Sequence, residues 1–152
     1  MAAPAVESAR RLLFDAVERM IACTGGLTTE ELRWAPPIRD ANSIASIMRH
    51  ALGALDQNVI ESLCLLGAVE RDREAEFAAI DATEAAITEH WRALRSRLDA
   101  ALDALSPADL DGPRPHPRFG VMDGHELLAR AVTHIYEHTG QAELTRQLLD
   151  AR

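Results

Sequence analysis

Apolar residues recur every three to four positions through four long segments of the chain, which is the spacing of helices that bury one face. The segments cover residues 6–24, 43–66, 82–105 and 123–149. Helix-ending signals follow the first three, namely Gly25-Gly26, Gly67 and Ser106-Pro107. Because four helices of about twenty residues, each with one apolar stripe, make up a four-helix bundle, the pattern predicts an all-α bundle.

The stretches between these helices differ in character. Residues 27–32 offer a threonine cap and an acidic first turn, so we expect one short helical turn there. Residues 70–76 are mostly charged and are interpreted as a solvated link, with the extension of a helix as the alternative. Residues 111–124 contain three prolines and three glycines, which predicts an irregular loop. None of these stretches has the composition of a linker between domains, so residues 1–152 are expected to fold as a single domain.

Composition agrees with helices and excludes some functions. Ala, Leu and Arg dominate, whereas Val and Ile are comparatively scarce. The formal net charge of −8 argues against a nucleic-acid partner that is bound through its phosphates. The N-terminus has no signal-peptide pattern, and no uncharged apolar run approaches the ~20 residues that span a bilayer. We therefore expect a cytoplasmic protein with no membrane partner, in which Cys23 and Cys64 are reduced thiols.

Two histidines of the fourth segment are the first sign of chemistry. His134 and His138 are four residues apart, so on a helix they project from one face about one turn apart. Leu127 and Leu148 share that general face, which points the pair toward the interior. Such a pair can give two imidazole nitrogens to one Zn²⁺, Ni²⁺ or Fe²⁺ ion. The alternative is a pair that is satisfied by hydrogen bonds and carries no metal.

A third histidine favours the metal. His50 lies in the second segment, at the edge of the apolar stripe that runs from Ile44 to Leu66. A bundle can bring this edge against the fourth helix. The sequence therefore predicts a metal site made of His50, His134 and His138. Three imidazole ligands leave coordination positions open for water or substrate, as in catalytic rather than structural zinc sites.

Other polar residues are weaker candidates. We expect His125, in the first turn of the last helix, to be exposed. His116 falls in the expected loop, from which it could reach the mouth of a pocket. Gln141 follows the histidine pair by one turn and is expected beside it, whereas Glu137 is expected to point away from it. Arg49 and Arg130 are interpreted as surface charges, with recognition of an anionic substrate as the alternative.

Three stretches carry a family resemblance. Residues 47–54, Ile-Met-Arg-His-Ala-Leu-Gly-Ala, resemble the second-helix signature of the DinB-like (damage-inducible) superfamily. Residues 134–142, which begin His-Ile-Tyr-Glu-His-Thr-Gly-Gln, resemble the signature of its last helix, and residues 27–34 resemble the link after its first helix. The resemblance implies a four-helix bundle with a long crossover and a metal held by His50, His134 and His138. Homodimers are common in that superfamily, so the resemblance also implies a homodimer here.

The resemblance and the open coordination positions suggest a reaction class without naming a reaction. Some members of the superfamily are transferases or isomerases that use mycothiol or bacillithiol. We expect a divalent metal, with zinc favoured over nickel or iron, and thiol S-transfer to a small electrophile, with a low-molecular-weight thiol as co-substrate. A metal-dependent hydrolase and a non-catalytic metal-binding stress-response protein are the alternatives.

Overall fold

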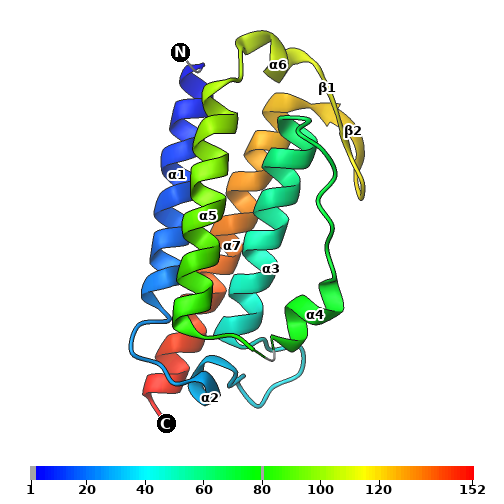
Figure 1. The fold of residues 1–152 in the computed structure, drawn as a ribbon. Coiled ribbons are helices and arrows are strands. Elements are labelled where there is room, and N and C mark those ends of the chain that lie inside the picture. The colour runs from blue at the N-terminus through cyan, green and yellow to red at the C-terminus, as the bar shows by residue number, and fades with distance from the viewer. Residues whose placement is uncertain (1–2, 80) are drawn as a thin grey trace.

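Four long helices form the body of the protein (Figure 1). A computed structural model describes residues 3–79 and 81–152. The long helices are α1 (Pro4–Ala22), α3 (Ile44–Asp56), α5 (Glu84–Asp103) and α7 (Gly124–Asp150). Helix α3 continues directly into the π-helix η1 (Gln57–Leu63). The prediction of an all-α four-helix bundle is confirmed, and none of the described helices is long and apolar enough to cross a membrane.

The connections between the helices include one long crossover. Helices α1 and α3 each pack against both α5 and α7. Figure 1 shows α1 and α7 running in one direction and α3 and α5 in the other. Because α3 and α5 are parallel, the chain after η1 must return along the bundle before α5 can begin. Residues 64–83 make this return, and its short helix α4 (Arg73–Ala78) lies against α3.

Polar caps define where several of the helices begin. The Ser43, Thr83 and Asp123 side chains each accept a hydrogen bond from a backbone N–H three residues on, which starts α3, α5 and α7. The expected turn after the first helix is the short helix α2 (Thr29–Leu32). The largest fully buried side chains are Leu13, Met20, Leu32, Ile44, Met48, Leu52, Leu55, Leu63, Leu94, Leu98, Leu102 and Leu110.

The prediction of an irregular loop over residues 111–124 is wrong. After the short helix α6 (Pro107–Asp111), strands β1 (Pro113–His116) and β2 (Gly120–Asp123) form an antiparallel hairpin in which Arg114 pairs with Met122. Backbone N–H groups of successive strand residues point to opposite edges, so prolines at every second position remove donors from one edge only. The other edge of β1 stays free to pair, which explains how a proline-rich segment forms a strand.

The helical spacing predicts two leucines to face the core that are exposed in the structure. Leu66 is 63% exposed because the helix ends at Leu63 and the chain reverses through Leu65, whose φ is +55°. Leu148 is 43% exposed, and the neighbouring Leu149 is the buried residue of that turn. Both errors lie at helix ends, where the apolar spacing no longer says which residue faces the core.

Gly124 allows α6 to approach the start of α7. A Cβ atom at this position would lie 2.7 Å from the Leu110 Cα and 2.8 Å from the Asp109 backbone oxygen. At Gly140, in the middle of α7, a Cβ atom would meet nothing within 4 Å. The same substitution should therefore have opposite effects at the two positions.

We predict that Gly124→Ala lowers the free energy of unfolding by about 1–3 kcal/mol, because backbone atoms must move to admit the methyl group. Gly140→Ala is the matched control and should raise it by up to about 1 kcal/mol, since alanine is the better helix former. Urea unfolding followed by circular dichroism measures both. Equal effects of the two substitutions would contradict the close approach of α6 to α7.

Candidate metal centre

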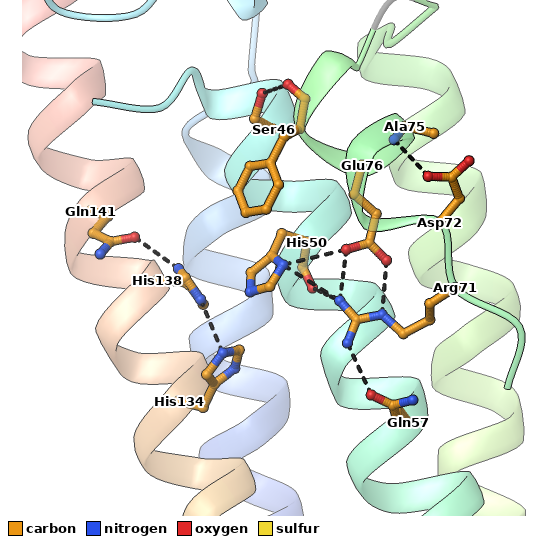
Figure 2. A network of polar contacts seen from close by, with 11 residues as sticks. Ser46, His50, Gln57, Arg71, Asp72, Ala75, Glu76, His134, His138 and Gln141 are labelled. Carbon is orange, nitrogen blue, oxygen red and sulfur yellow. Dashed lines mark hydrogen bonds and ion pairs between the residues drawn. The ribbon is translucent and has the colours of Figure 1, made fainter. Parts of the chain in front are cut away.

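Three histidines converge between α3 and α7 (Figure 2). His50 projects from α3 and is 7% exposed, while the half-buried His134 and His138 project from successive turns of α7. One ring nitrogen of each residue lies within 4.8 Å of those of the other two. The structure therefore brings together all three residues that the sequence nominated, and it does so because α3 packs directly on α7.

The spacing of the ring nitrogens fits a shared cation. The Nε2 atoms of His134 and His138 are 3.2 Å apart. Two imidazole nitrogens bound tetrahedrally to one zinc ion, at about 2.0–2.1 Å each, would be separated by about 3.3 Å. The two histidines of α7 thus already lie at the distance that binding one zinc ion requires. His50 approaches from the other helix, with its ring centroid 4.9 Å from that of His138.

Hydrogen bonds at the opposite ring nitrogens turn Nε2 toward the centre. Gln141 Oε1 lies 2.8 Å from His138 Nδ1, and Glu76 Oε2 lies 3.3 Å from His50 Nδ1. An oxygen acceptor next to each Nδ1 favours the tautomer in which Nδ1 carries the hydrogen and Nε2 keeps a free lone pair, although Arg71 Nη2 also lies 3.4 Å from His50 Nδ1. Ligand histidines in metal sites are oriented in this way. The expected position of Gln141 beside the site is confirmed.

The prediction that residues 70–76 form a solvated link holds for their exposed members but not for Arg71 and Glu76, which lie against His50. The Arg71 guanidinium donates to both Glu76 carboxylate oxygens, at 2.8 and 2.6 Å, and also to Gln57 Oε1 at 3.2 Å. Figure 2 shows the Glu76 carboxylate and the Arg71 guanidinium both in contact with His50. The crossover has to run back along α3, and this course places its charged residues over the site.

Gly53, one turn after His50, makes room for this contact. A Cβ atom on Gly53 would lie 2.6 Å from Glu76 Oε1 and 3.2 Å from Arg71 Nε. A glycine inside a helix costs roughly 1 kcal/mol relative to alanine, so its presence in α3 needs a structural reason. The close approach of the Arg71–Glu76 ion pair supplies that reason.

The electrostatics keep at least two of the rings neutral near pH 7. Burial, followed by the proximity of His138 and His50, lowers the pKa of His134 to about 4. Burial and the neighbouring His138 and Arg71 also lower the pKa of His50, and Glu76 only partly opposes this. Because the neutral imidazole is the form that binds a metal, the site holds two of its candidate ligands in the competent protonation state.

A cavity of about 230 Å³ opens on the His50 and His134 side of the cluster. Its walls come from α3 and η1, from the crossover, from the tip of the β1–β2 hairpin and from α7. Glu137 lines this cavity, although the sequence placed it facing away from the ligands. A cavity beside the three histidines gives a small molecule access to the open coordination positions of a metal.

His116 is the clearest residue that sequence reasoning undervalued. It is 6% exposed and lines the cavity, and its Nε2 lies 2.9 Å from Asn58 Oδ1 of η1. The one signal in the sequence was the alternation of Arg114 and His116 with prolines. By contrast, the expected exposure of His125 is confirmed.

We predict that Glu76→Gln weakens zinc binding by about 10- to 100-fold, because the neutral amide no longer stabilises the donated Nδ1–H of His50. Competition with a chromophoric chelator measures the affinity. Glu74→Gln, an exposed carboxylate on the same short helix, is the matched control and should leave the affinity unchanged. If both variants bind zinc like the parent protein, Glu76 has no part in orienting His50.

The chain is similar to known proteins in its family profile and in its fold. The family profile of the DinB superfamily matches residues 5–142, a stretch that contains all three histidines. A conserved protein from Enterococcus faecalis superposes with a TM-score of 0.78 at 16% identity, covering 100% of this chain and 99% of the other. YfiT from Bacillus subtilis, described as a probable metal-dependent hydrolase with an unusual four-helix bundle topology, superposes with a TM-score of 0.76 at 13% identity, covering 95% and 87%. No curated protein matches the chain. The chain belongs to the DinB superfamily.

Proposed function

We propose that the protein is a metal-dependent enzyme whose divalent ion, with zinc favoured, is held by His50, His134 and His138. The observation that carries the proposal is the convergence of the three ring nitrogens within 4.8 Å of one another. Hydrogen-bond partners behind His50 and His138 support it, since they hold Nε2 toward a common point. Three protein ligands leave one or more positions for a reactant.

The cavity favours catalysis over a purely structural metal. A structural zinc site has four protein ligands and is closed, whereas this cluster has three candidate ligands and a cavity of about 230 Å³ beside it. When bound, the metal would lower the pKa of a coordinated thiol or water and so supply a nucleophile near neutral pH. The chain's own contribution is to orient the ligands and to shape the cavity that positions the second reactant.

Thiol S-transfer to a small electrophile is the first reaction that we propose. A low-molecular-weight thiol brings its own nucleophile, and it needs no catalytic base once metal coordination has lowered its pKa. This suits a site in which Glu76, the carboxylate nearest His50, is already engaged by Arg71 and by the ring. The resemblance to superfamily members that use mycothiol or bacillithiol supports the same choice.

Hydrolysis is the second candidate, and one specific finding favours it. YfiT, which shares the fold over 95% of this chain, is described as a probable metal-dependent hydrolase. Glu137 lines the cavity beside His134 and would be the carboxylate available to accept a proton from an attacking water. A variant at Glu137 therefore separates the two reactions, because hydrolysis would depend on it and thiol transfer would not.

The test uses untagged, zinc-loaded protein with bacillithiol or mycothiol and a chromogenic electrophile such as 1-chloro-2,4-dinitrobenzene, and in parallel a p-nitrophenyl ester. We expect metal-dependent thiol conjugation that falls at least about 100-fold in His134→Ala, since that variant removes one of the three metal ligands. His125→Ala, an exposed histidine of the same helix, is the control and should retain full activity.

The outcomes discriminate among the candidates. Ester cleavage that needs the metal, His134 and Glu137, without thiol conjugation, would replace transfer by hydrolysis. Stoichiometric zinc with neither activity would leave a non-catalytic metal-binding protein. Less than about a tenth of an equivalent of zinc, unchanged in His50→Ala, would exclude the metal site itself.

A further inference from the structure

The cavity beside the histidines has a charge opposite to that of the protein as a whole. The chain carries a formal net charge of −8. Four arginines nevertheless line the cavity, against Glu137 as its one lining carboxylate among residues 3–79 and 81–152. A concave surface of one sign with low-dielectric walls concentrates ligands of the other sign. The four arginines are Arg71, Arg73, Arg118 and Arg130.

These arginines are not equivalent. Arg71 is held by both oxygens of Glu76, so its charge is already compensated. Arg130 forms an exposed ion pair with Glu126 at 2.9 Å, a contact that costs little to exchange for another anion. Within the described part of the chain, Arg118 has no carboxylate within 4.0 Å. The guanidinium charge at the tip of the hairpin therefore lacks a protein counter-ion there.

Arg118 and Arg130 are brought together by an aromatic ring. Their guanidinium carbons lie 5.3 and 5.2 Å from the ring centroid of Phe119, which is 50% exposed. Stacking on an aromatic ring orients a guanidinium and leaves its N–H edge available for a planar oxyanion. Two such groups from different elements, one on the hairpin and one on α7, thus flank one point of the cavity wall.

The tip of the hairpin is positioned by the buried His116. Its Nδ1 accepts hydrogen bonds from the backbone N–H groups of Arg118 and Phe119, at 3.1 and 3.3 Å. Its Nε2–H is then left to donate to Asn58 Oδ1. The Phe119 ring also stacks on the His116 ring, with centroids 4.7 Å apart. His116 therefore holds the hairpin tip, and with it Arg118 and Phe119, against Asn58 of η1.

We propose that Arg118 and Arg130 bind a carboxylate or phosphate group of the small-molecule reactant, while its reactive end lies toward His50 and His134. The cavity volume of about 230 Å³ suits a small-molecule reactant. This assignment of a substrate class rests on the proposed function. The anion contact itself uses only arginine side chains, so it does not require a bound metal.

Calorimetric titration of inorganic phosphate, and separately of succinate, into metal-free protein at low ionic strength tests the proposal. We expect one binding site per chain, for one or both anions, that weakens at least 10-fold in Arg118→Gln and in Arg130→Gln. Arg92→Gln is the control, because Arg92 is an exposed arginine on α5 outside the cavity. Circular dichroism melting establishes that each variant is folded.

The same titration in His134→Ala separates this proposal from the metal site. Phosphate or succinate binding that persists there, and still depends on Arg118, supports the anion site whatever the fate of the metal. Three results would overturn the proposal: no binding of either anion to the parent protein, equal weakening by Arg92→Gln, or binding that appears only with zinc and ignores both arginine variants. The last result would place the anion on the metal instead.

Discussion

The surroundings of the site are organised around three imidazole rings that approach one another closely between α3 and α7. Burial, together with the nearby rings of His138 and His50, lowers the pKa of His134 to about 4, so the three rings are not all protonated near pH 7. Neutral rings in turn present lone pairs to one another, and between His134 and His138 a single hydrogen at most can relieve this. A cation shared by the three nitrogens satisfies all of them at once.

The unusual course of the chain serves this cluster. A bundle whose successive helices are antiparallel needs only short loops, whereas the parallel pair α3 and α5 requires a return along the full bundle. That return carries Arg71 and Glu76 onto His50, and Gly53 leaves the space for them. The π-helix η1 adds a second layer, since Gln57 binds the crossover and Asn58 binds the hairpin. π-Helical turns occur often at functional sites, and here one holds two walls of the cavity.

The part of this arrangement that the sequence predicted is the part encoded by local spacing. The helical repeat located all four long helices, and the four-residue spacing of His134 and His138 put them on one interior face. The contacts of Arg71 and Glu76 could not be read in this way, because they depend on where a crossover lies relative to a helix some twenty residues earlier. The hairpin was missed for a different reason. Its prolines suggested irregular backbone, and the one contrary sign was their alternation with Arg114 and His116, which the structure shows to be buried.

The proposed site holds one divalent ion through three imidazoles and leaves it an open position. X-ray absorption at the zinc edge of the zinc-loaded protein tests this most directly. We expect three imidazole nitrogens at about 2.0–2.1 Å together with at least one oxygen ligand from solvent. A sulfur ligand near 2.3 Å, or a first shell made of oxygen with fewer than three imidazoles, would contradict it.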